Sequence, residues 1–292
     1  MTGTEIAIRA HAKINVFLRI LGRRADGFHD IESLLLPVSL HDLIVVRPAE
    51  RLSIAMTGDR ASALAGTTAE NLVLLAARAI ADAAGLAGAG AEIRVDKRIP
   101  VAAGLGGGSA DAAATLRALN DLWGCGLDDA GLARVGLRVG SDVPGLLADD
   151  AVFVSGRGER VDPVHVAATT WVLAPQPFQV LASRAYGWWD EDGVTGPDPG
   201  ALIAAAETGN APVLGDALFD DLQTPVARRH PEVSATVSAF LRAGALGAVM
   251  SGSGPTVAAL ATDPALADRL ANAVPGSIVV SAPSASRDAA AG

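Results

Sequence analysis

The residues with the clearest chemical meaning form a glycine-rich segment in the first half of the chain. Gly104-Leu-Gly-Gly-Gly-Ser109 follows a predicted strand and leads into a helical pattern. Glycines let a backbone approach an anion closely, and a helix N-terminus offers unpaired N–H groups with a favourable dipole. Ser109 and Asp111 would lie in the first turn, where Ser109 either caps the helix or binds a phosphate. The four glycines exceed the needs of an ordinary turn, so the segment predicts an anion-binding loop.

The familiar phosphate-loop patterns do not match this segment. A Walker A loop ends in Gly-Lys-Ser/Thr, and no lysine lies between Lys97 and the helix. The dinucleotide pattern needs a third glycine at position 109, where a serine stands. The protein-kinase glycine loop fails for the same reason, and no His-Arg-Asp catalytic loop follows it. The sequence therefore excludes all three assignments.

Two further residues have the types needed for phosphoryl transfer. Lys13 alternates with apolar neighbours in Ala12-Lys-Ile-Asn15, so it points either to solvent or into a cleft. Asp142 lies in Gly140-Ser-Asp-Val-Pro144, where an aspartate is usually a turn-former that bonds local N–H groups. As a pair they could do more: the lysine would keep the carboxylate ionised, and the carboxylate would orient or deprotonate an attacking hydroxyl.

Several aromatic and polar residues have both a structural and a functional interpretation. Phe28-His29 puts an aromatic face beside an imidazole, and Phe28 could equally pack under a sheet. Tyr186, the only tyrosine, lies near Trp188-Trp189, which could form a local core. Cys125 follows a helix-ending glycine without an evident catalytic histidine, so we interpret it as structural.

Composition limits the class of protein. The 292 residues correspond to about two domains, and 50% hydrophobic with 19% charged residues is typical of a folded globular chain. One cysteine excludes an intramolecular disulfide framework and a zinc site built on several cysteines, which fits the cytoplasm. We expect no metal site made of protein ligands alone.

Charge and hydropathy limit the partners. The net charge of −9 disfavours nucleic acid and anionic membranes as partners but allows a small phosphorylated ligand in a local pocket. The mean hydropathy is +0.34, yet the long uncharged stretches are interrupted by prolines, glycines and polar residues. No signal-peptide pattern opens the chain. We therefore expect a cytoplasmic protein with no membrane partner and no obligate protein partner.

The elements that must position these residues do not alternate regularly between strand and helix, which predicts an α+β fold rather than a doubly wound sheet. We expect a helix over 70–84, with Thr67 and Glu70 as a capping box. We also expect a soft domain boundary near 155–165, which divides the chain into 1–160 and 161–292. The other predicted helices cover 112–123, 128–139, 202–207 and 232–243. The predicted strands cover 5–9, 14–20, 43–46, 91–97, 151–154, 171–174, 248–250 and 256–260.

Taken together, seven segments resemble one family of enzymes. They are Ala12-Lys-Ile-Asn-Val-Phe-Leu18, Gly22-Arg-Arg-Ala-Asp-Gly-Phe-His29, Asn71-Leu72, Asp96-Lys-Arg-Ile-Pro100, Gly104-Leu-Gly-Gly-Gly-Ser-Ala-Asp111, Gly140-Ser-Asp-Val-Pro144 and Ser251-Gly-Ser-Gly254. The chain resembles the GHMP superfamily of small-molecule kinases over nearly its whole length. The combination of Ala-Lys-Ile-Asn with the Asp-Gly-aromatic-His loop is similar to the members that act on a cytidine diphosphate of methylerythritol.

This resemblance implies a two-domain kinase fold and an activity. The activity would be ATP-dependent phosphorylation of the 2-hydroxyl of 4-(cytidine 5′-diphospho)-2-C-methyl-D-erythritol, in non-mevalonate isoprenoid biosynthesis. Asp142 would be the base and Lys13 would assist it. Asn71 and Lys97 would lie near the adenine, and Mg²⁺ would be held largely by the phosphates. The ATP phosphates would be wrapped by Pro100, Val101, Ala102, Ala103, Gly104, Leu105, Gly106, Gly107, Gly108, Ser109 and Ala110.

The resemblance also implies a cytidine end of the site. Asn15 and His29 would face the cytidine, while Phe28 and Tyr186 would stack on its base. Phe28 stands where the family more often has tyrosine, so stacking is kept and a hydroxyl contact is lost. The alternatives are a homoserine or mevalonate kinase of the same superfamily and a nucleotide-binding regulator without catalysis. A dinucleotide-dependent oxidoreductase fails on the glycine spacing.

Overall fold

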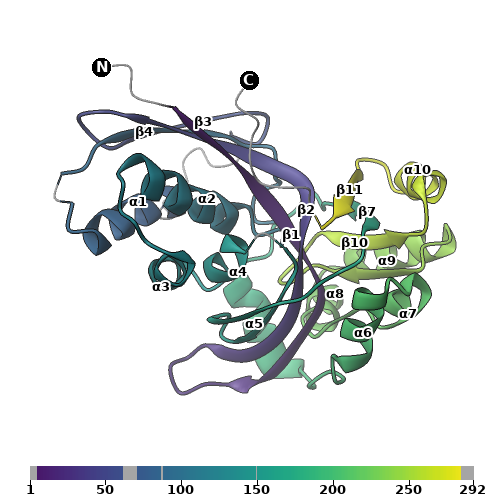
Figure 1. Ribbon diagram of the computed structural model, residues 1–292. Helices are drawn as coiled ribbons and strands as arrows, with labels where there is room; N and C mark the ends of the chain where they lie inside the picture. Colours follow the sequence, from purple (N-terminus) through teal and green to yellow (C-terminus); the bar gives the residue numbers. More distant parts are fainter. Residues whose placement is uncertain (1–4, 62–70, 87, 149, 284–292) are drawn as a thin grey trace.

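The fold is organised around one long β-hairpin. The computed structural model describes residues 5–61, 71–86, 88–148 and 150–283, and the hairpin consists of β1 (Ile6–Arg23) and β2 (His29–Pro48) (Figure 1). The predicted strands 5–9 and 14–20 are thus one strand. Register shifts between His11 and Lys13 and between Asn15 and Phe17 bend the pair without ending it. Such bulges re-aim side chains, and these two flank the segment that carries Lys13.

The hairpin belongs to the larger of two sheets. Its order is β3 (Ser53–Thr57), β4 (Ala91–Asp96), β2, β1 and β8 (Phe219–Asp220), while β5 (Val152–Gly156) pairs with β2 and with β6 (Arg160–Pro163). The strand β8 comes from the second half of the chain and lies parallel to β1. This pairing brings residues around position 220 close to the hairpin, a long-range contact that no local pattern predicts.

Four helices of the first half cover one face of this sheet (Figure 1): α1 (Leu72–Ala83), α2 (Gly107–Leu122), α3 (Asp129–Val139) and α4 (Val143–Leu147). The inner face of α2 is rich in fully buried alanines, which let it pack closely on the hairpin. The side chain of Asn71 caps α1 by accepting from the Val73 N–H at 2.9 Å. The predicted capping box of Thr67 and Glu70 lies outside the described residues.

The second sheet is antiparallel and smaller. Its order is β11 (Ile278–Ala282), β7 (Thr169–Ala174), β10 (Val257–Ala261) and β9 (Gly247–Met250). The helices of this half are α5 (Ala182–Asp192), α6 (Gly200–Thr208), α7 (Ala211–Asp216), α8 (Gln223–Arg229), α9 (Pro231–Arg242) and α10 (Pro264–Ala273). The predictions at 202–207, 232–243, 248–250 and 256–260 lie within two residues of α6, α9, β9 and β10.

The two sheets share a buried core. Side chains of the hairpin, such as Ile14 and Leu36, pack in one cluster with Trp171 of β7 and Leu260 of β10. This arrangement of two sheets with packed helices confirms the predicted α+β class. The predicted division after residue 160 falls inside β6, and it stays a prediction. In the described part of the chain no helix is long and apolar enough to cross a membrane.

We predict that Trp171→Ala lowers the free energy of unfolding by about 3–5 kcal/mol, since it empties a large volume in the core between the sheets. Trp171 is fully buried and its indole N–H donates to Thr169 at 2.8 Å. Urea unfolding measures the effect. Val279→Ala, on the neighbouring strand at 45% exposure, serves as the control and should change stability by less than about 0.5 kcal/mol. Equal losses in the two variants would contradict this packing.

Candidate active site

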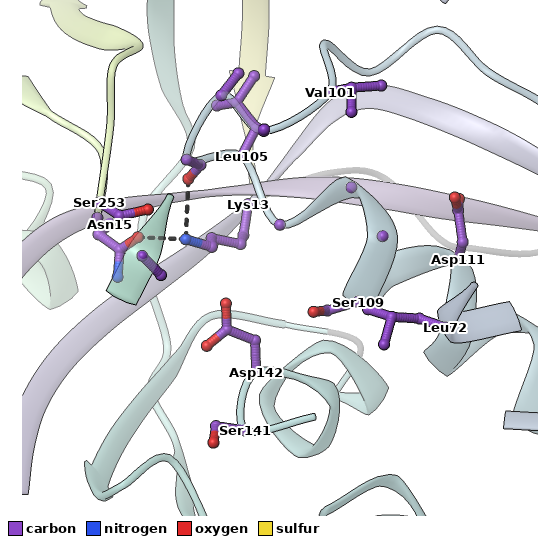
Figure 2. Close-up of a pocket in the computed structure, with 18 of the residues that line it drawn as sticks. Lys13, Asn15, Leu72, Val101, Leu105, Ser109, Asp111, Ser141, Asp142 and Ser253 are labelled. Atoms are coloured by element: carbon purple, nitrogen blue, oxygen red, sulfur yellow. Dashed lines mark hydrogen bonds between the residues drawn. The ribbon is translucent and has the colours of Figure 1, made fainter. Parts of the chain in front are cut away.

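A cavity of about 770 Å³ brings most of the predicted site residues together. It opens between the glycine loop, the middle of the hairpin and the turn that carries Asp142 (Figure 2). Most of the predicted residues line it: Lys13, Asn15, Asn71, Lys97, Pro100, Val101, Ala102, Ala103, Gly104, Leu105, Gly106, Gly107, Gly108, Ser109, Asp142 and Tyr186. Three predicted residues are not part of the lining: Ala110 is buried on α2, Phe28 is exposed, and His29 lies against Tyr186.

The glycine loop leads into an uncapped helix end. The helix α2 begins at Gly107, five residues before the predicted start, and its N-cap Gly106 has a left-handed φ of 68°. No side chain caps this end, and Ser109 is the third helical residue rather than the cap. The first N–H groups of a helix have no partner within the helix, so here they remain available for an anion in the cavity.

The loop is locked against the turn Ser251–Gly254. The Ser251 hydroxyl donates to the Gly104 carbonyl at 3.0 Å, and the Thr256 N–H donates to the Ala103 carbonyl at 3.2 Å. A Cβ on Gly104, whose φ is 78°, would overlap the backbone of this turn. The motif Ser251-Gly-Ser-Gly254 therefore serves to fix the shape of the glycine loop.

Lys13 is a buried cation at the centre of the cavity. Its Nζ donates to Asn15 Oδ1 at 2.5 Å and to the Gly104 carbonyl at 3.0 Å (Figure 2). The alternation of β1 explains the position: Ala12 and Ile14 point into the core, so Lys13 and Asn15 point to the opposite face. Asn15 is held in turn by its Nδ2, which donates to Ser33 at 2.8 Å. The side chain of Lys13 therefore points into a cleft and not to solvent, the two positions that the sequence left open.

Asp142 is placed differently from an ordinary turn aspartate. It is the N-cap of α4, yet its side chain makes no capping hydrogen bond, and no other hydrogen bond to its carboxylate occurs among the described residues. Figure 2 shows the carboxylate pointing across the cavity toward Lys13. The carboxylate is therefore free to accept a proton or a hydrogen bond from a bound molecule, as the functional interpretation requires.

The electrostatics of this centre involve one residue that the sequence analysis missed. Burial lowers the pKa of Lys13, while the carboxylates of Asp142 and Asp220 oppose this shift. Burial also raises the pKa of Asp220 well above its ordinary value. Asp220 Oδ1 accepts from the Leu222 N–H at 2.8 Å, and Oδ2 is buried without a hydrogen bond in the described structure. No sequence signal marks it, because its place depends on the two-residue strand β8.

Lys97 is held by two buried acidic side chains. Its Nζ lies 2.5 Å from Asp42 and 2.6 Å from Asp111, and Asp42 also accepts from the N–H groups of Arg98 and Ile99. Burial, together with Asp42, raises the pKa of Asp111 to about 8 against the opposing effect of Lys97. Although Lys97 lines the cavity, its charge is therefore already compensated, and it fixes the segment before the glycine loop.

One end of the cavity is aromatic. Tyr186 of α5 lines it, and His29 stacks on Tyr186 with a centroid distance of 4.9 Å. Burial raises the pKa of the Tyr186 hydroxyl, and Asp142 and Asp220 add to this shift. Phe28 is 47% exposed, with the Arg157 guanidinium 4.8 Å from its ring centroid. Tyr186 and Phe28 thus differ in burial, and their joint stacking on a base stays a prediction.

Comparison with known proteins identifies the family. The model of the GHMP kinases N terminal domain matches residues 71–157, and that of the GHMP kinases C terminal matches residues 202–278. A protein of Symbiobacterium thermophilum named 4-diphosphocytidyl-2-C-methyl-D-erythritol kinase is 44% identical over 90% of this chain and 93% of its own length. This chain belongs to the GHMP kinase family. It is a small-molecule kinase, and GHMP kinases use ATP as the phosphate donor.

A second relative and one solved structure carry the same kinase name, and a further solved structure shares the fold. A protein of the same name from Kineococcus radiotolerans is 40% identical over 91% of this chain and 85% of its own length. The crystal structure of a 4-(cytidine 5′-diphospho)-2C-methyl-D-erythritol kinase has a TM-score of 0.79 at 32% identity, covering 95% of this chain and 99% of that one. A homoserine kinase of Cytophaga hutchinsonii has a TM-score of 0.75 at 20% identity, covering 99% and 97%, which shows the shared fold alone.

We predict that Gly104→Ala weakens ATP binding about tenfold or more, equivalent to about 1.4 kcal/mol. The added Cβ is strained at a φ of 78° and collides with the turn Ser251–Gly254, so the loop has to move. Calorimetric titration with ATP measures this change. Gly124→Ala is the matched control, because its φ is 62° and nothing lies within 4 Å of its Cβ. Similar affinities for both variants would show that the loop shape does not matter for ATP.

We predict that Asp111→Asn reduces the pH dependence of stability. The native Asp111 keeps its proton up to a pH of about 8, whereas the unfolded chain releases it near its ordinary pKa of 3.8. The free energy of unfolding therefore falls as pH rises through this window, by up to about 1.4 kcal/mol per pH unit from this group.

Urea unfolding between pH 5 and 8 should give a shallower slope for Asp111→Asn than for the wild type. Asp121→Asn changes an exposed carboxylate of the same helix and should keep the wild-type slope. An unchanged slope in Asp111→Asn would contradict the raised pKa.

Proposed function

We propose that this enzyme transfers the γ-phosphoryl group of ATP to the 2-hydroxyl of 4-(cytidine 5′-diphospho)-2-C-methyl-D-erythritol, in non-mevalonate isoprenoid biosynthesis. The observation that supports it most directly is the meeting of Lys13, Asp142 and an uncapped helix N-terminus in one cavity. The substrate follows from the curated relatives, which carry this kinase name at 36–44% identity over most of the chain.

In this proposal Asp142, Lys13 and the start of α2 each have a different role. Asp142, free of protein hydrogen bonds, accepts the proton of the attacking hydroxyl. Lys13, fixed by Asn15 and Gly104, stabilises the negative charge that develops on the transferred group. The N–H groups at the start of α2 bind the phosphates of ATP. Because Lys13 and the start of α2 are held in place before substrate binds, little reorganisation of these groups is needed during transfer.

The adenine and cytidine lie at opposite ends of the cavity in this proposal. Asn71 and Leu72, at the start of α1, form the adenine end together with Lys97. Asn15, His29, Tyr186 and Phe28 form the cytidine end.

Mg²⁺ fits the proposal as a companion of ATP. No group of three His, Cys, Asp or Glu side chains suited to a metal ion occurs among the described residues. Mg²⁺ prefers phosphate oxygens and water, so it would enter bound to the ATP phosphates and neutralise part of their charge. We place the reaction in the cytoplasm, consistent with the single cysteine.

Homoserine and mevalonate are the competing acceptors within the family. Solved structures with these names share the fold at 20% and 14% identity. The aromatic end formed by Tyr186 and His29 favours an acceptor that carries a base, because small aliphatic acceptors offer nothing to stack.

We predict that Asp142→Asn lowers kcat by about 10²–10⁴-fold, the range typical of a lost general base, while ATP affinity stays within about twofold. ADP release is followed in a coupled assay with the cytidine compound, homoserine, mevalonate or no acceptor. Asp129→Asn, an 88% exposed carboxylate near the start of α3, is the control and should keep wild-type turnover.

Each outcome of this assay is informative. Release that needs the cytidine compound supports the substrate, and its loss in Asp142→Asn supports the base. Release with another acceptor rejects the substrate but keeps the kinase, and full activity of Asp142→Asn rejects the base.

A further inference from the structure

The imidazole of His29 is held on several sides by α5. Its ring stacks on Tyr186 with an interplanar angle of 26°, and its edge meets Trp189 at a centroid distance of 5.8 Å. Its Nε2 lies 2.7 Å from Asp190 Oδ1, and only 8% of the side chain is exposed. Two rings and one carboxylate of α5 thus fix both the plane and the edge of this imidazole.

The sequence of α5 explains this geometry. Tyr186 and Asp190 are four residues apart, so they lie on the same face of the helix, one turn from each other. That face meets the end of the hairpin where β2 begins with His29. Asp190 also lies 3.5 Å from Arg23 of β1.

The contact with Asp190 determines what the other ring nitrogen offers. A carboxylate only accepts hydrogen bonds, so the proton of a neutral imidazole lies on Nε2. Nδ1 then carries a lone pair, and no hydrogen bond to it occurs within the described structure. His29 does not line the cavity itself, but its ring lies against Tyr186, which does, so this acceptor borders the aromatic end.

We propose that Asp190 is a positioning residue that fixes the tautomer of His29 and thereby makes the site prefer an amino-bearing pyrimidine over a carbonyl-bearing one. The exocyclic amino group of cytosine donates a hydrogen bond that Nδ1 accepts. The corresponding oxygen of uracil is itself an acceptor and would face a second lone pair. Burial makes such a mismatch costly, so one hydrogen-bond direction can select the base. This inference rests on the proposed function, since it deepens the choice of acceptor.

The first test measures the tautomer directly. Nitrogen NMR of the histidine-labelled wild-type chain, with His29→Gln for assignment, should show a protonated Nε2 and an unprotonated Nδ1. Titration with cytidine 5′-diphosphate should shift the Nδ1 resonance, and uridine 5′-diphosphate should not. A proton on Nδ1 of the free enzyme, or equal shifts with both nucleotides, would overturn the inference. This arm needs no variant of Asp190 and no turnover.

The second test uses Asp190→Asn, whose amide can also donate to Nε2 and so permits the other tautomer. We expect the KM for the cytidine acceptor to rise about tenfold, the KM for ATP and kcat to stay within about twofold, and the cytidine-over-uridine ratio of kcat/KM to fall about tenfold. The control is Arg23→Gln, which removes the other ion-pair partner of Asp190 and should leave the ratio unchanged.

The outcomes distinguish a failure of the role of Asp190 from a failure of the proposed function. The same loss of discrimination in Arg23→Gln, or none in Asp190→Asn, would overturn the role of Asp190. If the wild type phosphorylates only a different acceptor, the proposed function fails, while the tautomer measurement still decides whether Asp190 controls His29.

Discussion

A buried ammonium is the constraint on which this site depends. Lys13 is 5% exposed, and an unpaired charge at that depth would be costly, so the surrounding backbone is arranged to compensate it. The bulges in β1 aim the Lys13 side chain into the cavity, where Asn15 and the Gly104 carbonyl accept its hydrogen bonds. Gly106 leaves room for the aliphatic part of Lys13, since a Cβ there would lie 3.0 Å from Lys13 Cε. Hairpin, glycine loop and Ser251–Gly254 turn meet at this one side chain.

The two proposed ligands, ATP and the cytidine diphosphate acceptor, are both polyanions, whereas the chain is acidic and its cavity carries little positive charge. The described lining of the cavity contains two lysines and no arginine, and Lys97 is already bound by Asp42 and Asp111. In the proposed function, phosphate binding would therefore depend on backbone N–H groups and on Lys13 rather than on a basic patch. A site of this kind is set by loop shape, which is why the glycine loop is locked to a turn that lies nearly 150 residues further along the chain.

Local patterns predicted the parts of the site that depend on local geometry. The anion-binding loop is predicted from four glycines before a helix, and a cleft is one of the two positions that the apolar neighbours of Lys13 allow for its side chain. The structure places the loop and Lys13 in one cavity. Asp42 and Asp220 could not be found this way. Asp42 lies within a 20-residue strand without a motif, and Asp220 depends on a strand of two residues pairing with β1. The roles of Asp42 and Asp220 arise only from tertiary contacts, and the same is true of the contacts between α5 and His29.

Identification of the phosphorylated product tests the proposed reaction most directly. Phosphorus NMR of a reaction with ATP, Mg²⁺ and 4-(cytidine 5′-diphospho)-2-C-methyl-D-erythritol should show the γ-phosphate resonance of ATP replaced by one new phosphomonoester, with the diphosphate of the acceptor intact. That result would mean that a hydroxyl of the acceptor received the group. Conversion of ATP to ADP and inorganic phosphate alone, or an altered diphosphate, would contradict it.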